Sequence, residues 1–573
     1  MESVKENTIF SNKIYTEVTK WLFPTILVAF SFVGVNRGID LTDTGYNMGN
    51  YIYLSKLDGM WYYSTLFSNF VGWLTVRLPF GATLLGANIY MGLIKASFGL
   101  FAYYYFTKRR GFTREPVFVA VFISFALWWI PNAGLYHYLS FYLLAAGTVL
   151  LCEGLFNDKR NCLFTAGVVL AANVFVRFPN VTNAGMIVAL WLYCFLKKES
   201  VRECLSKTLR CIAGYVSTLV LVFGIIAACG KLPNYVTAIR ELFAMTDDAP
   251  TYGPMFMVKN LVNSYTCVWY WLVPIALGLI LLIAVSFLPE KFKPFGIAAS
   301  VGGFALIYFW EYKKELFDYN FRSYSSIYLF MVVILIISML LLVMGLFIKD
   351  LPIEVRTWCG AAIMIQLITP IGSNNSLYAV MNNMFFILPV SLYVLARLWK
   401  TKRFMYLTPG LWLFILLFLF QGICFRWVYV FRDGFLGDID SRVYNNKTLA
   451  GMKTEAVNAA FLTELSDLWE KEGLKDHTVL AFGNNPGIAF VTGSAPAISS
   501  TWPILESYSS EKFATQLKML EKRMEEGESV VVATDATLEI EGRKQEILKD
   551  FLQKYKFKSI YDKNDLKIWI LEE

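Results

Sequence analysis

Two aspartates lie three residues apart, directly after the first long apolar run of this 573-residue chain, in the segment Asn36-Arg37-Gly38-Ile39-Asp40-Leu41-Thr42-Asp43-Thr44-Gly45-Tyr46. This spacing allows both carboxylates to face one side of a helical turn or to flank one pocket. A carboxylate that is partly desolvated at a membrane surface has a raised pKa and can accept a proton from a hydroxyl group. The same cluster also fits the N-terminal cap of a helix that begins near Tyr46, and the spacing leaves both interpretations open.

Basic residues elsewhere are candidates for binding an anion. Arg177, at the end of an apolar segment, can hold phosphate oxygens through two parallel hydrogen bonds or anchor a helix at the membrane interface. Arg240 and Lys259 lie in one long connection. They can serve as anion ligands or be ordinary solvated charges of a loop. His137 can bind phosphate, assist proton transfer or form an ordinary hydrogen bond at the interface. Lys95 lies within an apolar segment, where a charge is costly, so it is either functional or partnered inside a bundle.

The elements that must position these residues belong to a membrane protein. Hydrophobic residues make up 56% of the chain and charged residues 17%, against about 45–50% and about 25% in soluble globular proteins. This composition, with a mean hydropathy of +0.48, excludes a soluble enzyme, a disordered scaffold and a fibrous protein. A helix that crosses the bilayer needs about 20 mostly apolar residues. Thirteen segments are predicted on this basis: 19–36, 81–106, 115–131, 134–155, 161–178, 181–196, 209–230, 263–288, 294–311, 325–348, 357–371, 381–398 and 408–427.

The distribution of Lys and Arg orients these segments. Alternate connections on one side hold 22 basic residues, whereas the connections on the other side hold 10. Cytoplasmic loops are enriched in positive charge, so we expect the N-terminus in the cytoplasm and a first segment that acts as a signal anchor rather than a cleaved signal peptide. An odd number of spans then places the C-terminal part on the extracytoplasmic side.

Charge also divides the chain into two parts. Residues 1–427 carry a net charge of +14, and residues 428–573 carry a net charge of −6. We expect a transmembrane domain over 1–427, with long external loops at 37–80 and 231–262 that carry the function, and an extracytoplasmic α/β domain over 428–573. The basic residues lie in membrane loops, so nucleic acid is not expected as a partner. Nine cysteines without a C-x-x-C spacing, and two histidines, do not indicate a structural metal site.

Patterns within the external parts predict their elements. Aromatic and polar residues alternate in 37–80, which is typical of short helices that lie in the membrane interface. The segment 483–487 lacks the Lys and the Ser or Thr of a phosphate-binding loop, so we expect a turn. In the C-terminal part we expect helices at about 451–472, 509–527 and 541–554 and strands at 478–482, 529–534, 557–561 and 566–571.

The motif Asp43-Thr44-Gly45-Tyr46, placed just after the first span, resembles the acidic motif of the GT-C superfamily of integral-membrane glycosyltransferases. The nearest types are the protein O-mannosyltransferases and the lipid A aminoarabinose transferases. Thirteen spans, long first and fourth external loops and an external α/β domain fit the latter layout. Thr44 stands where many members carry a second acid, so Asp40 is a candidate substitute. The Trp-Trp-Asp signature of oligosaccharyltransferases is missing, because Ile130-Pro131 follows Trp128-Trp129.

The resemblance implies an inverting transferase for a hexose or pentose, at the outer face of a bacterial plasma membrane among membrane lipids. The sugar would pass from a polyprenyl-phosphate donor to a hydroxyl group of a cell-envelope glycan, lipid or protein acceptor. A monophosphate leaving group needs less countercharge than a diphosphate, so a divalent cation is compatible but not obligatory. Asp43 would be the catalytic base with Asp40 in support, and Arg177 the leading phosphate ligand. The other substrate ligands would be His137, Tyr138, Arg240, Lys259 and Tyr46.

Two other functions compete with this one. A transporter or flippase of lipid-linked sugars would predict inverted repeats and paired charges inside the spans, and Lys95 is the one clear charge of that kind in the sequence. A scaffold that presents the C-terminal domain would leave the Asp40 and Asp43 cluster without a role. In the transferase, the C-terminal domain would help to bind the acceptor or cover the site.

Overall fold

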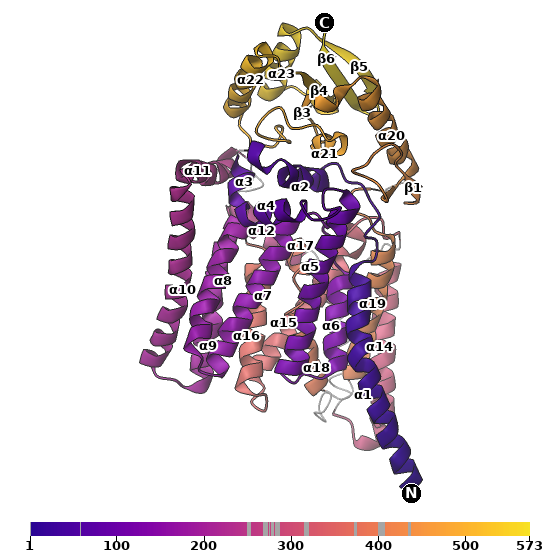
Figure 1. Ribbon diagram of the computed structural model, residues 1–573. Helices are drawn as coiled ribbons and strands as arrows, with labels where there is room; N and C mark the ends of the chain where they lie inside the picture. Colours follow the sequence, from indigo (N-terminus) through magenta and orange to yellow (C-terminus); the bar gives the residue numbers. More distant parts are fainter. Residues whose placement is uncertain are drawn as a thin grey trace.

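The computed structural model describes most of the chain: residues 2–57, 59–248, 254–266, 273, 276, 280, 287–314, 320–371, 375–398, 407–433 and 437–572. Seven helices in this part are long and apolar enough to cross a membrane, so the chain is a multi-pass membrane protein. The long helices run side by side, and a smaller domain that contains a sheet lies at one end of the bundle (Figure 1). The predicted fold class, an α-helical membrane protein with a C-terminal α/β domain, is confirmed.

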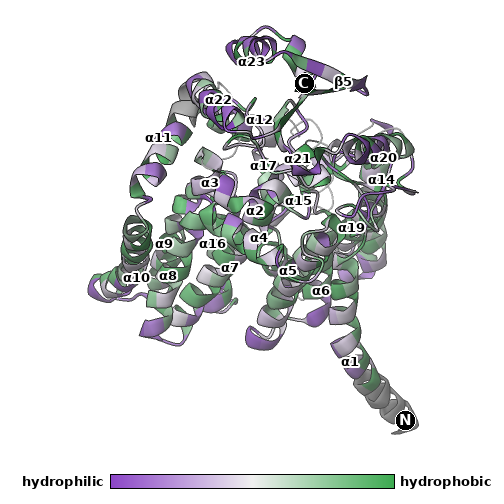
Figure 2. Cartoon of the chain, turned by 45° about the horizontal axis from the view of Figure 1, so that its top comes forward, coloured by the Kyte–Doolittle hydropathy of each residue, from purple (hydrophilic) through white to green (hydrophobic). Residues whose placement is uncertain are grey.

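The bundle follows from long runs of apolar residues. Hydrophobic residues predominate along its helices, whereas hydrophilic residues gather in the domain with the sheet (Figure 2). The bundle helices are α1 (Glu2–Ser31), α5 (Leu84–Tyr104), continued by the π-helical turn η2 (Tyr105–Arg109), α6 (Arg114–Ala126), α7 (Leu135–Phe156), α8 (Arg160–Val176), α9 (Ile187–Lys197), α10 (Val201–Ala228), α14 (Lys293–Lys313), preceded by η5 (Glu290–Phe292), α15 (Ser325–Phe347), α16 (Ile353–Ile368), α18 (Leu388–Leu398) and α19 (Thr408–Val428).

The described helices match most of the predicted spans. The predicted span 263–288 lies largely outside the described residues, and the total of thirteen spans stays a prediction. The span 181–196 begins as the 3-10 helix η3 (Phe178–Met186), which has a proline in its first turn, and becomes α-helical only in α9. The span 381–398 is interrupted after α17 (Leu377–Met381), which Asn382 ends.

Short helices lie between the bundle and the C-terminal domain, as the aromatic pattern of 37–80 predicts (Figure 1). In that segment they are α2 (Asp43–Ile52), η1 (Leu54–Lys56), α3 (Met60–Ser64) and α4 (Leu66–Thr75). The second long connection forms α11 (Leu232–Asp248) and α12 (Pro254–Thr266).

The C-terminal domain is built around one four-stranded sheet. Its strand order is β3-β4-β6-β5. Strand β3 (Thr478–Phe482) is parallel to β4 (Val530–Asp535). Strand β6 (Leu566–Leu571) is antiparallel to both of its neighbours, β4 and β5 (Phe557–Lys563). The helix expected from residue 451 begins only at Ala456, because Lys453–Thr454 pairs as a strand. The other elements are β1 (Ser441–Arg442), β2 (Lys453–Thr454), α20 (Ala456–Lys471), η6 (Leu474–Asp476), α21 (Ile488–Thr492), α22 (Ser510–Glu525), η7 (Ala536–Glu539) and α23 (Arg543–Lys554).

Helix α2 is packed directly against the C-terminal domain through two glycines. A Cβ atom added to Gly45 would lie 2.4 Å from the Cα atom of Gly487, so a residue with a side chain fits at position 45 only if the backbone shifts. The amide N–H of Gly487 also donates to the carbonyl oxygen of Leu41 at 2.8 Å. The predicted turn 483–487 is therefore present and serves as the contact surface for α2.

A shared apolar core reinforces this contact. Buried side chains of α2 and of the C-terminal domain belong to one cluster, which includes Met48 and Tyr51 from α2 and Ile488 and Phe490 from α21. The glycine contact and the apolar core together hold the start of α2, which contains Asp43 and follows Asp40, against the C-terminal domain.

We predict that Gly45→Ala destabilises the protein. The added methyl group would overlap backbone, and overpacking of this kind typically costs about 1–3 kcal/mol. The measurement is the thermal unfolding midpoint of the purified protein in detergent. The matched control is Gly224→Ala in α10, where nothing lies within 4 Å of the added atom, so the helix should gain stability or stay unchanged. Equal midpoints for the two variants would contradict the close approach.

Candidate active site

The carboxylate of Asp40 is fully engaged in holding the start of α2. One oxygen, Oδ1, accepts hydrogen bonds from the amide N–H (2.9 Å) and the hydroxyl group of Thr42, and Oδ2 accepts one from the amide N–H of Thr44 at 2.7 Å. Asp40 is buried, with 6% of its surface exposed. The capping interpretation of the sequence therefore describes the contacts of Asp40.

Asp43, one turn later, faces a cavity and an arginine. Its Oδ2 atom lies 3.3 Å from Nη1 of Arg432, which also donates a hydrogen bond of 2.6 Å to the hydroxyl group of Thr42. Arg432 adopts a left-handed backbone conformation with φ of 50°, which is uncommon for a residue with a side chain. The ion pair thus joins the segment after the first apolar helix to the segment after α19.

The surroundings of Asp43 favour its protonated form more than water does. Burial raises the pKa of the Asp43 carboxyl to about 6, while the charge of Arg432 opposes this rise and the charge of Asp40 adds to it. The side chain still exposes 38% of its surface, on the side of the cavity. Asp43 is therefore an accessible carboxylate that titrates close to neutral pH, which suits a general base.

The cavity in front of Asp43 has a volume of about 350 Å³ and lies between the two domains. The loop of the C-terminal domain between α21 and α22 closes one side through Trp502 and Leu505. The ring of Trp502 lies 5.6 Å from the ring of Tyr46. The other residues that line the cavity are Asp43, Asn47, Asn50, Trp61, Thr65, Trp129, Ile130, Pro131, Gly134, Tyr136, His137, Tyr324, Asn375, Phe431 and Arg432. We call this space the Asp43 cavity.

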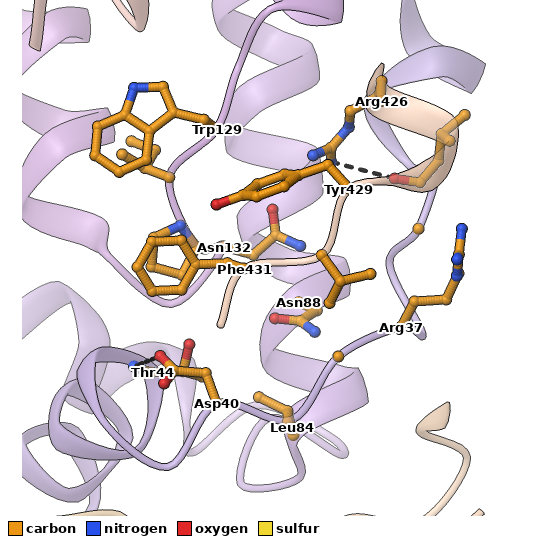
Figure 3. Close-up of a pocket in the computed structure, with 16 residues that line it drawn as sticks. Arg37, Asp40, Thr44, Leu84, Asn88, Trp129, Asn132, Arg426, Tyr429 and Phe431 are labelled. Carbon is orange, nitrogen blue, oxygen red and sulfur yellow. Dashed lines mark hydrogen bonds between the residues drawn. The ribbon is translucent and has the colours of Figure 1, made fainter. Parts of the chain in front are cut away.

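A second, smaller pocket of about 50 Å³ adjoins the Asp43 cavity, and we call it the cationic pocket (Figure 3). The two spaces have four lining residues in common: Trp129, Ile130, Pro131 and Phe431. The cationic pocket is lined on its remaining sides by Val33, Gly34, Arg37, Gly38, Asp40, Thr44, Leu84, Asn88, Asn132, Arg426, Tyr429 and Val430.

Positive charge is concentrated around the cationic pocket. Arg37 donates to the carbonyl oxygen of Trp427 at 2.5 Å, and Arg426 donates to that of Val33 at 3.1 Å. Arg426 is close enough to Arg37 and to Lys95 for their charges to interact. Among the residues that line the pocket, Asp40 is the one acid, and its oxygens are already engaged. Like charges gathered in a poorly hydrated place favour the binding of an anion.

Lys95 supports this pocket from behind. Only 2% of its surface is exposed, and its Nζ atom donates to Oδ1 of Asn132 at 3.3 Å. Asn132 itself lines the pocket, so Lys95 contacts a residue of the pocket wall. Lys95 is therefore partnered within the bundle, as one of the two interpretations of the sequence expected.

The structure brings some of the expected ligands to the Asp43 cavity. Tyr46 and His137 line it, and burial raises the pKa of Tyr46 to about 12, so its phenol is neutral. Tyr138 points elsewhere: its ring stacks on Trp128 at 4.7 Å, and its hydroxyl group lies 3.3 Å from the carbonyl oxygen of Pro131. Tyr138 lines neither cavity, because successive residues of a helix face different directions, and its contact with substrate stays a prediction.

The expected basic ligands lie outside the residues that line the two cavities. Arg177 ends α8, is partly buried and acts electrostatically on His137, next to the Asp43 cavity. Arg240 in α11 and Lys259 in α12 are exposed. The arginines that do line the cavities are Arg37, Arg426 and Arg432, which were not among the expected ligands. Their positions offered a signal: Arg37 follows the first apolar segment, Arg426 lies at the end of the last one, and Arg432 follows it.

The residues around Asp43 do not fit a divalent cation. Within the described ranges, no group of three or more His, Cys, Asp or Glu side chains is arranged to hold a metal ion. The oxygens of Asp40 accept hydrogen bonds from Thr42 and Thr44, and the neighbour of Asp43 is a guanidinium. Countercharge at this site is supplied by arginine.

We predict that Arg432→Gln raises the pKa of Asp43 above about 6, because the variant loses the positive charge that stabilises the carboxylate. The measurement is infrared difference spectroscopy of the carboxyl band during a pH titration, with Asp43→Asn to identify the band. The control is Arg442→Gln, which removes an exposed arginine of β1. A midpoint that is the same in Arg432→Gln and in the control would contradict the ion pair.

Comparisons with known proteins found similar solved structures, two of which are described here. No family model and no curated protein matches the chain. It is similar to ArnT from Cupriavidus metallidurans bound to undecaprenyl phosphate, at 10% identity and a TM-score of 0.45, over 96% of this chain and 98% of that one. It is also similar to the archaeal oligosaccharyltransferase AglB from Archaeoglobus fulgidus, in complex with an inhibitory peptide and a dolichol-phosphate, at 11% identity and a TM-score of 0.46, over 97% of this chain and 75% of that one.

Proposed function

We propose that this protein is an inverting glycosyltransferase that moves a sugar from a polyprenyl-phosphate donor to an acceptor hydroxyl group. The observation that carries the proposal is the position of Asp43 in a cavity that adjoins a pocket rich in arginine. The resemblance of Asp43-Thr44-Gly45-Tyr46 to the motif of membrane glycosyltransferases supports it.

The cationic pocket is proposed to bind the phosphate group of the donor. Arg37 and Arg426 present guanidinium groups, which match phosphate oxygens in geometry and charge, and Asn88 and Asn132 add amide groups. The pocket volume of about 50 Å³ is several times the roughly 10–15 Å³ that one water molecule needs on the same measure, so the pocket can hold a group larger than water. Arg37 and Arg426 take the place of Arg177, Arg240 and Lys259 as phosphate ligands in this proposal.

The sugar of the donor then lies in the Asp43 cavity, which adjoins the cationic pocket. The oxygen of the acceptor hydroxyl attacks the anomeric carbon and its proton passes to the Asp43 carboxylate, while the bond from that carbon to the phosphate oxygen breaks. The electron pair leaves with the polyprenyl phosphate, whose growing negative charge the arginines stabilise. Attack from the face opposite the leaving group inverts the anomeric carbon.

Asp43 and Asp40 have different roles in this proposal. Asp43 is the base, because its carboxylate is accessible and titrates near neutral pH. Asp40 is a positioning residue, because its oxygens hold the backbone that carries Asp43. Arg432 keeps Asp43 ionised and oriented, and His137 and Tyr46 complete the walls around the sugar.

The placement in the cell follows the sequence expectations. We propose that the protein lies in a bacterial plasma membrane, with a cytoplasmic N-terminus and the domain 428–573 on the extracytoplasmic side. The cavities lie at the end of the bundle that faces this domain, where a lipid-borne head group would meet a cell-envelope acceptor.

We predict that Asp43→Asn lowers turnover by about 10²–10⁴-fold, the usual contribution of a general base, while donor binding stays unchanged. The assay incubates the purified protein with polyprenyl-phosphate sugars and follows the release of polyprenyl phosphate. Turnover of the wild type should fall as the pH drops below about 6, because Asp43 then becomes protonated. Asp438→Asn, which alters an acid with 90% of its side chain exposed, is the control.

Full activity of Asp43→Asn would remove Asp43 from the mechanism. Movement of an intact lipid-linked sugar across proteoliposomes, without cleavage of its phosphate bond, would instead support the transporter.

We also predict that Arg37→Gln weakens binding of polyprenyl phosphate by about 10–100-fold. A hydrogen bond between charged groups contributes about 1.5–3 kcal/mol, and the variant removes one such partner. Binding is measured by titration of the lipid into protein held in nanodiscs. Arg77→Gln is the control, because Arg77 is exposed and packs on the ring of Trp73 at 3.8 Å. Equal affinities of the two variants would contradict the placement of the phosphate.

A further inference from the structure

A third hollow adjoins the Asp43 cavity, and we call it the aromatic subsite. It has a volume of about 30 Å³ and is lined by Tyr46, Asn50, Leu57, Gly59, Met60, Trp61, Tyr62, Ser499, Ser500, Trp502, Leu505, Ser507 and Tyr508. Five of these residues also line the Asp43 cavity, whereas none of them lines the cationic pocket. The Asp43 cavity therefore lies between the cationic pocket and the aromatic subsite.

The walls of the aromatic subsite combine flat rings with hydroxyl groups. Trp61, Tyr62 and Tyr46 come from the short helices of the membrane domain, and Trp502 and Tyr508 come from the C-terminal domain. Aromatic faces carry partial negative charge and attract the C–H groups of a sugar ring. None of the described residues that line the hollow is charged, so its chemistry suits a neutral ligand with many hydroxyl groups.

Several polar groups of the subsite are held in place by hydrogen bonds and can still donate further ones. The indole N–H of Trp61 donates to the hydroxyl oxygen of Ser507 at 2.8 Å, and the hydroxyl oxygen of Ser500 accepts from the amide N–H of Trp502 at 3.1 Å. Each serine hydroxyl can still donate a hydrogen bond of its own. The indole nitrogen of Trp502 is buried and has no hydrogen-bond partner within the described residues. Rigid rings with spare donors are typical of sites that recognise small polar ligands.

We propose that the aromatic subsite binds one sugar unit of a glycan acceptor and presents its hydroxyl group to Asp43. This inference rests on the proposed function and specifies its acceptor class. The order of the three spaces carries the argument, because a donor phosphate in the cationic pocket leaves the far side of the Asp43 cavity for the acceptor. Tyr46 and Asp43 lie three residues apart on α2, so a sugar packed against Tyr46 lies beside the carboxylate.

The test measures sugar binding directly, by saturation-transfer difference NMR. The probes are methyl α-D-glucopyranoside, methyl α-D-mannopyranoside and methyl N-acetyl-β-D-glucosaminide. We expect transfer to the ring protons of at least one probe with the wild type, a loss of about tenfold with Trp502→Ala, and retention with Trp502→Phe, which keeps a ring. Trp21→Ala in α1, which removes a ring with 68% of its surface exposed, is the matched control and should bind like the wild type.

Two further measurements make the outcome decisive. A peptide rich in Ser and Thr serves as an alternative probe. Its saturation transfer should be the same with the wild type and with Trp502→Ala. The KM for a sugar acceptor should rise in Trp502→Ala and stay near the wild-type value in Trp502→Phe. Trp502→Phe shows that a loss in Trp502→Ala comes from the missing ring rather than from misfolding.

The results separate this inference from the function on which it rests. No binding of any sugar probe, equal binding by Trp502→Ala and the wild type, or binding of the peptide in place of sugars would overturn the acceptor subsite, even if polyprenyl phosphate is still released. Full activity of Asp43→Asn would overturn the proposed function instead, whatever the sugar probes show.

Discussion

The ion pair between Asp43 and Arg432 is the contact around which the site is organised. It joins two segments separated by almost 400 residues, one after the first apolar helix and one after the last. Burial raises the pKa of the Asp43 carboxyl, and a positive charge beside it opposes that rise. Arg432 provides that charge, and the backbone around Asp40 fixes the direction from which Asp43 meets it.

The remaining geometry follows from the position of this pair at a domain boundary. The cationic pocket lies toward the bundle, with Arg37 and Arg426 at the ends of α1 and α19. The aromatic subsite lies toward the C-terminal domain, with Trp502 and Ser507. A charged ligand and a neutral one can therefore approach the same carboxylate from opposite directions, each through surroundings that suit its chemistry.

The sequence predicts the elements better than it predicts the contacts. Apolar length identifies helices such as α7 and α14 within a few residues, and the strands β3 and β6 are predicted to the residue. Asp43 and Tyr46, which belong to one local motif, both line the Asp43 cavity. The ion pair of Arg432 could not be predicted because its partner is distant in the chain, and Tyr138 lines neither cavity because neighbours on one helix face different sides. Spacing along the chain carries no information about which loops meet in space.

The contact between Gly45 and Gly487 has a consequence for how ligands enter. Backbone packed on backbone, with an apolar core continuous across the junction, prevents the C-terminal domain from swinging open as a rigid flap. In the proposed reaction, both substrates would therefore reach Asp43 from the sides of this junction rather than through a gap between α2 and the C-terminal domain.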